Sequence, residues 1–168
     1  MTSDDCTRSG SAPAGPPLTA EQRDRYSRQI AMPEVGVAGQ RKLLASSVLV
    51  IGLGGLGSPA AMYLAAAGIG RIGLADGDLV QRSNLNRQIL HTTADIGTLK
   101  VHSAAAKLHA LNPHTIITPH PQQVTAETLT SLLTDYDYNF ALDATDGINK
   151  EGGNFDTIGL PLRHTEAP

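Results

Sequence analysis

The sequence has little of several residue types, and each shortage excludes a class of protein. Among its 168 residues the single cysteine is Cys6, which excludes a disulfide framework, a Cys-x-x-Cys zinc site and a buried catalytic thiol. Tryptophan is absent, and there are only four tyrosines and two phenylalanines, so the core must be built from Val, Ile, Leu and Ala. This use of cysteine fits a reducing cytoplasm.

Charge and hydropathy exclude two further kinds of partner. The chain has 13 Lys and Arg against 16 Asp and Glu, a net charge of −3, without the basic clusters that bind nucleic acid or acidic membranes by bulk charge. The longest apolar region, at 60–72, is too short to span a bilayer and is interrupted by glycine. We therefore expect a soluble, cytoplasmic protein that binds neither nucleic acid nor membrane.

The order of apolar and polar segments predicts the fold class. Residues 1–18 are rich in Ser, Thr, Gly, Pro and Ala, and we expect a disordered tail there. A helical segment capped by Thr19 should follow. Beyond Ser47, strands and helices alternate four times, which predicts a Rossmann-like α/β fold with a doubly wound, mostly parallel sheet. The expected helices are 18–28, 37–45, 58–67, 101–111 and 126–133, and the expected strands are 48–51, 71–75, 115–118 and 140–143.

A glycine-rich turn links the first expected strand to the next helix. Within Gly52-x-Gly54-x-x-Gly57, the first glycine permits a tight turn, the second lets the backbone approach a phosphate, and the third allows close packing. The helix N-terminus that follows attracts anions. Asp76 ends the second strand, where its carboxylate can bind a ribose hydroxyl. The alternatives are a structural glycine turn and a turn aspartate.

The segment at 77–98 is expected to be mostly loop with one or two helical turns, and connectors of this length are usually functional. A dinucleotide needs no cations beyond its glycine turn, whereas a triphosphate could be neutralised by Arg87 and Lys100. Taken singly, each could instead be an ordinary solvated side chain. However, a cation at a helix N-terminus, as at Lys100, opposes the helix dipole unless an anion is nearby.

Two carboxylates, Asp143 and Asp146, follow the fourth expected strand. One of them could hold Mg²⁺ against phosphate oxygens, and a simple strand-end turn is the alternative. The six histidines show no metal-binding spacing, so we expect surface or capping roles for them.

Several segments between residues 18 and 150 carry a resemblance to a known family. The sequence is similar to the ThiF/MoeB/HesA family and, more distantly, to the adenylation domains of ubiquitin-activating enzymes. The matching segments are RYSRQI at 25–30, GLGGLGSPAAMYLAAAGIG at 52–70, DGDLVQRSNLNRQILH at 76–91, G-x-L-K at 97–100, LNPH at 111–114 and LDATD at 142–146.

The resemblance implies an activity for the chain. Members of the family use ATP and Mg²⁺ to adenylate the C-terminal glycine of a small ubiquitin-like protein, such as a sulfur carrier for molybdopterin synthesis, thiamine synthesis or tRNA thiolation. Residues 19–150 would form this adenylation domain, with an NAD/FAD-binding type of fold, and residues 151–168 would be a divergent tail.

The resemblance also implies roles for the matching residues. Arg28, Arg87 and Lys100 would be catalytic. Arg28 would reach the γ-phosphate of the ATP bound to the second subunit of a dimer, which would be either a homodimer or a dimer with a full-length relative. Asp146 would hold Mg²⁺, and Gly147 stands where the family usually has Asn. The nucleotide-binding positions would be Gly52, Gly54, Gly55, Gly57, Asp76, Ser83, Asn84, Arg87, Lys100, Asp146 and Gly147.

The end of the chain departs from the family. Nothing after Lys150 resembles it, and only 22 residues follow Asp146, too few for the further strands and the acceptor cysteine of relatives. We therefore expect a C-terminally truncated domain with apolar surface or an open sheet edge at 140–142, whose activity could be lost. The alternatives are a non-catalytic nucleotide-binding or dimerisation remnant, and an NAD(P)-dependent oxidoreductase domain.

Overall fold

The chain forms two compact units, residues 1–42 and 43–168. The computed structural model describes residues 16–136, 138–145 and 160–161. The predicted tail at 1–18 therefore overlaps the described residues only at 16–18, where Leu18 is buried. No helix among the described residues is both long enough and apolar enough to cross a membrane.

The first unit is helical. It contains α1 (Ala20–Arg25), α2 (Ser27–Ile30) and the beginning of α3 (Gly36–Ala45). Thr19 caps α1 as expected, because its hydroxyl accepts a hydrogen bond from the Gln22 amide while the Gln22 side chain accepts one from the Thr19 amide. The prediction of a single helix at 18–28 is wrong in one respect. The helical segment is interrupted at Tyr26, a buried residue with φ −98° and ψ 16°.

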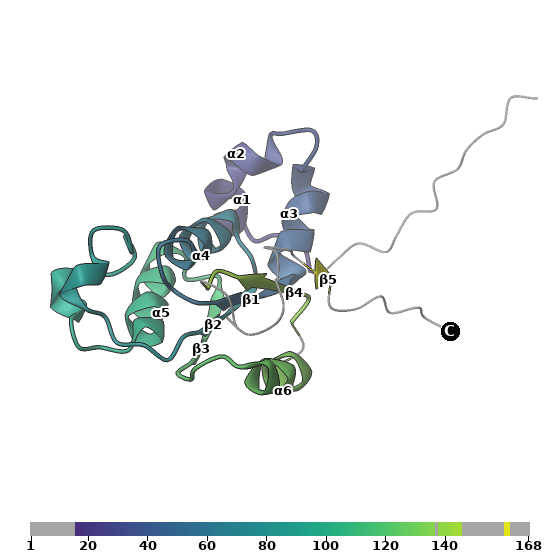
Figure 1. Cartoon of the computed structure of the whole chain (residues 1–168). Helices are drawn as coiled ribbons and strands as arrows, with labels where there is room; N and C mark the ends of the chain where they lie inside the picture. The colour runs from purple at the N-terminus through teal and green to yellow at the C-terminus, as the bar shows by residue number, and fades with distance from the viewer. Residues whose placement is uncertain (1–15, 137, 146–159, 162–168) are drawn as a thin grey trace, which may run out of the picture. The chain divides into compact units, whose positions relative to one another are not determined.

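The second unit contains a five-stranded sheet in the order β3-β2-β1-β4-β5 (Figure 1). The first four strands are parallel and β5 is antiparallel to β4. This confirms the Rossmann-like α/β prediction. Because β1 to β4 are parallel, their carboxyl ends lie at one edge of the sheet. The strands are β1 (Ser47–Ile51), β2 (Arg71–Ala75), β3 (Ile116–His120), β4 (Phe140–Asp143) and β5 (Leu160–Pro161).

Helices cover both faces of this sheet (Figure 1). On one face, Val48 and Val50 of β1 pack in a core with α4 (Gly57–Ala67) and α5 (Lys100–Leu111). On the other face, Leu49 and Ile51 pack with α6 (Ala126–Tyr136). β1 is therefore buried on both sides, which explains its uninterrupted apolar sequence. The long connector has two short 3₁₀ helices, η1 (Arg82–Asn84) and η2 (Thr93–Asp95), as expected.

Tyr138 fills the face of the sheet that α6 covers. Its hydroxyl lies 2.8 Å from His120 Nε2, and the Arg71 guanidinium lies 5.1 Å from its ring centroid. Gly73 makes room for the ring, because a Cβ there would lie 2.2 Å from the Tyr138 hydroxyl. The expectation of surface or capping roles is wrong for His120 and His91, which are both buried.

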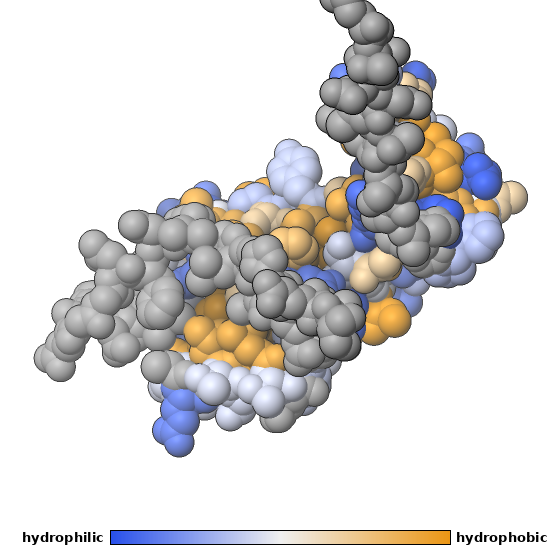
Figure 2. All heavy atoms as spheres, turned by 90° about the vertical axis from the view of Figure 1, so that its right-hand side faces the viewer, coloured by the Kyte–Doolittle hydropathy of each residue, from blue (hydrophilic) through white to orange (hydrophobic). Residues whose placement is uncertain are grey.

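The outer edge of β4 is partly covered. Phe140 and Ala141 pair with Pro161 and Leu160 of β5, so the edge is not open along its whole length. The expected apolar exposure is present at Phe140, which is 41% exposed. Figure 2, in which the right-hand side of Figure 1 faces the viewer, shows hydrophobic atoms at the surface on this side.

Replacing Gly73 should test the packing of Tyr138. Gly73→Ala should lower the free energy of unfolding by about 1–3 kcal/mol, because the new methyl group overpacks the site. Denaturant unfolding measures this loss. In a Tyr138→Leu background the same substitution should cost clearly less, since the two positions share one space. Equal costs in both backgrounds would contradict the packing.

Stability should also depend on the titration of His120. Burial lowers the pKa of its imidazole, so the unfolded chain binds a proton more readily than the folded chain does. The free energy of unfolding should therefore fall as the pH is lowered from about 7 toward 5, through the ordinary histidine pKa of about 6.5. Urea unfolding should show a weaker pH dependence for His120→Phe, whereas His102→Gln, at an exposed position, should retain the wild-type dependence.

Candidate functional site

A cavity of about 700 Å³ opens at the carboxyl ends of the parallel strands. Ligands of doubly wound sheets bind at this edge, and the volume lies in the range of small-molecule sites. The walls come from the glycine turn at 52–56, from the end of β2 and the first part of the connector at 75–88, and from the first residue of α5. The segments that follow β3 and β4 complete them.

The glycine turn brings backbone to the cavity wall. Gly52 has φ +83°, a conformation that favours glycine. A Cβ at Gly57 would lie 1.8 Å from the Gly52 carbonyl oxygen, so only glycine lets α4 begin this close to β1. Gly54 and Gly55 line the cavity, where nothing crowds a Cβ closer than 3.6 Å. The turn therefore presents open backbone at the N-terminus of a helix, which suits a phosphate.

Asp76 ties the glycine turn to the end of β2. Its carboxylate accepts hydrogen bonds from the amides of Leu53 at 2.7 Å and Asp78 at 2.8 Å. The side chain is almost fully buried and lines the cavity. Each carboxylate oxygen can accept more than one hydrogen bond, so Asp76 retains capacity for a ribose hydroxyl, and that role stays a prediction.

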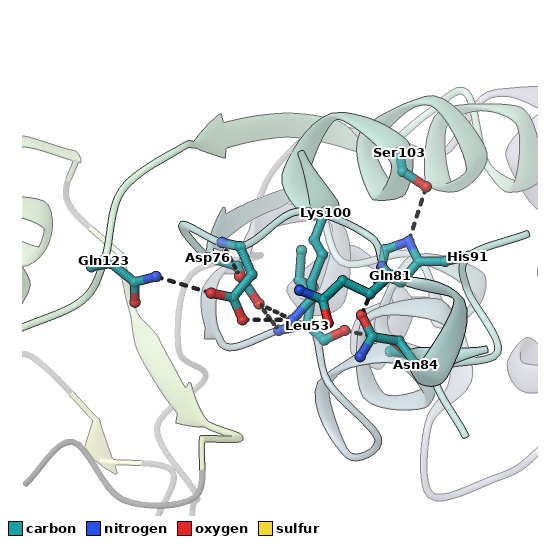
Figure 3. Close-up of polar contacts among 10 residues, drawn as sticks. Leu53, Asp76, Gln81, Asn84, His91, Lys100, Ser103 and Gln123 are labelled. Atoms are coloured by element: carbon teal, nitrogen blue, oxygen red, sulfur yellow. Dashed lines mark hydrogen bonds and ion pairs between the residues drawn. The ribbon is translucent and has the colours of Figure 1, made fainter. Parts of the chain in front are cut away.

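Lys100 already has anions beside it, and they belong to the protein. Its ammonium donates a hydrogen bond to Asp78 Oδ2 at 2.8 Å and lies 3.8 Å from Asp76 Oδ2 (Figure 3). These carboxylates account for a buried cation at the beginning of α5, so its position alone does not require a phosphate. The hydrogen bond from Lys100 and a second one, from Gln123 Nε2 at 3.0 Å, hold the pKa of Asp78 below its usual value, although burial opposes them.

The connector brings two of its three predicted residues to the cavity. Asn84 and Arg87 are part of the lining, whereas Ser83 is not. Asn84 Oδ1 accepts a hydrogen bond from the Gln81 amide at 2.9 Å, which fixes η1 (Figure 3). Arg87 is exposed, and its Nη1 donates to the Ser83 carbonyl and to Asn86 Oδ1, both at 3.1 Å. Its guanidinium can still reach an anion, because it has five N–H donors.

Sequence reasoning missed four polar lining residues. They are Asp78, Gln88, Gln123 and Thr145. Gln88 is buried, and its Oε1 has no hydrogen-bond partner in the described part of the chain. The D-x-D spacing of Asp76 and Asp78 and the position of Gln88 one residue after Arg87 were the only signals of this role. Gln123 carried no signal, because it reaches the cavity only through the turn after β3.

Besides Ser83 and Gly57, which are not part of the lining, three predicted residues are not placed at the cavity. Arg28 is exposed in α2 and belongs to the first unit, while Asp146 and Gly147 lie outside the described residues. Asp143 Oδ1 accepts hydrogen bonds from the Thr145 amide and hydroxyl, at 3.0 and 2.8 Å, and so stabilises the turn after β4. Within the described ranges, no group of three His, Cys, Asp or Glu side chains could hold a metal ion. The Mg²⁺ prediction at Asp146 stays a prediction, because Asp146 lies outside the described residues.

Curated relatives share most of this chain but are much longer. Over 130 residues the chain is 48% identical to the adenylyltransferase and sulfurtransferase Uba4 of Aspergillus fumigatus, an alignment that covers 77% of this chain and 26% of that protein. It is 51% identical over 131 residues to the adenylyltransferase and sulfurtransferase MOCS3 of Anopheles gambiae, covering 78% of this chain and 29% of that one. The chain thus spans about a quarter of the length of these relatives.

Solved structures agree with this relationship. The tRNA N6-threonylcarbamoyladenosine dehydratase TcdA of E. coli, in complex with ATP, superposes with a TM-score of 0.71 at 29% identity, covering 77% of this chain and 52% of that one. The E. coli protein MccB bound to a succinimide superposes with a TM-score of 0.63 at 27% identity, covering 73% of this chain and 37% of that one. The ThiF family model matches residues 26–151, and the chain belongs to the ThiF family.

Proposed function

We propose that this chain binds ATP and adenylates the C-terminal glycine of a small ubiquitin-like protein, such as a sulfur carrier. The observation that carries the proposal is the convergence of the glycine turn, Asp76, Asn84, Arg87 and Lys100 on one cavity. Membership of the ThiF family, the names of the two relatives and the ATP complex of TcdA support it. We expect the protein to act in the cytoplasm.

The proposed reaction is an in-line displacement at the α-phosphorus. A carboxylate oxygen of the partner's C-terminal glycine forms a bond to phosphorus, the bond from that phosphorus to the oxygen bridging to the β-phosphate breaks, and pyrophosphate leaves with the bonding pair. The products are an acyl-adenylate and pyrophosphate. This step needs positioning and charge stabilisation rather than a protein nucleophile.

The described residues can supply most of that positioning. Asp76 would accept hydrogen bonds from the ribose, and the open backbone of the glycine turn would approach the phosphates. Arg87 and Lys100 would stabilise the negative charge that develops on the leaving oxygen. Asn84 lines the same wall, held in place by its bond to the Gln81 amide.

Two further parts of the proposal involve groups beyond this cavity wall. Asp146 would hold Mg²⁺, which supplies positive charge to the phosphate oxygens when bound. Arg28 would act on the nucleotide of a second subunit, in a homodimer or in a dimer with a longer relative. Size-exclusion chromatography of the chain, with and without such a relative, tests this association.

Pyrophosphate exchange tests the reaction directly. The chain, incubated with ATP, Mg²⁺ and a ubiquitin-like sulfur carrier, should incorporate labelled pyrophosphate into ATP, and a carrier that lacks its C-terminal glycine should give none. ATP binding without exchange would favour the non-catalytic alternative. Binding of NADH in preference to ATP would contradict the proposal and favour an oxidoreductase domain.

Replacing Arg87 should weaken the binding of phosphates but not of the nucleoside. Hydrogen bonds to charged groups contribute about 1.5–3 kcal/mol, so Arg87→Ala should raise the Kd for ATP by about 10- to 100-fold and leave the Kd for adenosine unchanged. Isothermal titration calorimetry measures both.

The matched control is Arg82→Ala. Arg82 is exposed on the same connector and does not line the cavity, so its loss should leave ATP binding within about twofold of wild type. Equal effects of the two substitutions would show that Arg87 acts only through the general charge of the connector.

A further inference from the structure

We propose that the buried pair His91 and Ser103, held from outside by Lys107 and Asp95, is a positioning device for the phosphate side of the cavity. The inference rests on the proposed binding of ATP. Neither His91 nor Ser103 lines the cavity. They would act through elements that do line it, namely the connector and α5.

His91 joins these two elements directly. Its Nδ1 lies 2.9 Å from Ser103 Oγ (Figure 3), and both residues are about 95% buried. His91 lies three residues after Gln88, whose carbonyl accepts a hydrogen bond from the His91 amide at 3.1 Å. Ser103 lies three residues, nearly one helical turn, after Lys100. The pair therefore ties the segment that carries Arg87 to the helix that carries Lys100.

The glycine turn is held by other contacts. Burial lowers the pKa of His91, and the backbone of Leu53 opposes that effect, but the buried His91 Nε2 has no hydrogen-bond partner in the described part of the chain. The Leu53 carbonyl accepts a hydrogen bond from Ser58 Oγ at 2.9 Å, while the Leu53 amide donates to Asp76. The His91–Ser103 pair therefore links the connector and α5 and leaves the glycine turn to Ser58 and Asp76.

Lys107 and Asp95 set the direction of the hydrogen bonds in the buried pair. Asp95 forms an ion pair with Lys107 and accepts a hydrogen bond from the Thr92 hydroxyl at 2.7 Å. Lys107 Nζ donates to Ser103 Oγ at 2.9 Å. An ammonium can only donate, so the Ser103 hydroxyl proton is free to point at His91 Nδ1. The imidazole is then neutral, with its proton on Nε2.

The charges around the imidazole favour the same state. Lys107 and Lys100 lower the pKa of His91, and Asp95, which lies beyond Lys107, raises it by a smaller amount than burial lowers it. Burial alone would raise the pKa of Asp95, but its hydrogen bonds to Lys107 and Thr92 hold that pKa well below the usual value. The ion pair therefore stays charged, and the imidazole stays neutral, at physiological pH.

A polar arrangement of this kind specifies geometry more than stability. Buried hydrogen-bonded groups gain little over an apolar pair of the same shape, whereas hydrogen bonds between two elements favour one arrangement of those elements. Loss of the Ser103 hydroxyl should let the connector shift relative to Lys100. Phosphate binding depends on both elements, whereas adenosine would bind mainly through the ribose contact with Asp76.

Ser103→Ala tests the device with the smallest change. The variant should bind ATP about tenfold more weakly, the equivalent of one misplaced charged hydrogen bond, and should bind adenosine within about twofold of wild type. Ser131→Ala, which removes an exposed serine hydroxyl from another helix, is the matched control and should change neither affinity. Equal weakening of ATP and adenosine binding, or unchanged binding of ATP, would overturn the positioning role.

The ¹⁵N NMR shifts of the imidazole provide a readout that packing alone would not move. In the wild-type chain His91 should be neutral with its proton on Nε2, and Ser103→Ala should give a mixture of tautomers. Lys107→Met, which removes the hydrogen bond to Ser103 Oγ but substitutes neither residue of the buried pair, should move the population in the same direction. A proton on Nδ1 in the wild-type chain would overturn the inference. Failure of the wild-type chain to bind ATP would instead overturn the proposed function, so the two failures are distinguishable.

Discussion

The cavity depends on the close approach of α4 to the end of β1. A side chain at Gly57 would collide with the carbonyl of Gly52, and the positive φ of Gly52 turns the chain sharply enough for the helix to begin there. The amide of Leu53, inside this turn, donates a hydrogen bond to the Asp76 carboxylate at 2.7 Å. Backbone geometry at two glycines therefore decides where the acidic end of β2 and the helix N-terminus meet.

The same constraint extends to β4. The backbone of Ala144 and the side chain of Thr145 lie about 3 Å from a Cβ placed on Gly52, so the turn after β4 can pack there only against glycine. Thr145 is held in turn by Asp143. Three strand ends are thus fixed around one loop, because β1 pairs in parallel with both β2 and β4.

Local sequence signals predicted the elements well and the contacts between them less well. The β-branched run at 48–51 and the helical spacing at 101–111 are properties of short segments, and both elements form as expected. The break at Tyr26 and the pairing of β5 with β4 depend on tertiary burial and on residues far apart in the chain, which no local pattern encodes.

In the candidate site too, residues in local sequence patterns were predicted and residues placed by tertiary contacts were not. The glycine turn, Asp76, Asn84, Arg87 and Lys100 lie in segments with recognisable spacing, and the structure brings them together. Gln123 was not predictable, because its position depends on how the turn after β3 packs against the connector. The pairing of Lys100 with Asp78 depends on the bridge between Leu79 and Leu99, which joins residues far apart in the connector. Lys100 does have an anion beside it, as its place at a helix N-terminus indicates, and that anion is Asp78.

The charged residues that line the cavity show what the site still needs in order to bind a triphosphate. Within the described lining, Arg87 and Lys100 are matched by Asp76 and Asp78, and Lys100 already forms an ion pair with Asp78. A triphosphate adds several negative charges, and burying charges without partners is costly. A nucleoside would need no further cations, whereas reaction at the α-phosphorus requires positive charge from elsewhere. The proposed Mg²⁺ at Asp146 and the proposed Arg28 of a second subunit, both of which the family resemblance implies, would supply that charge.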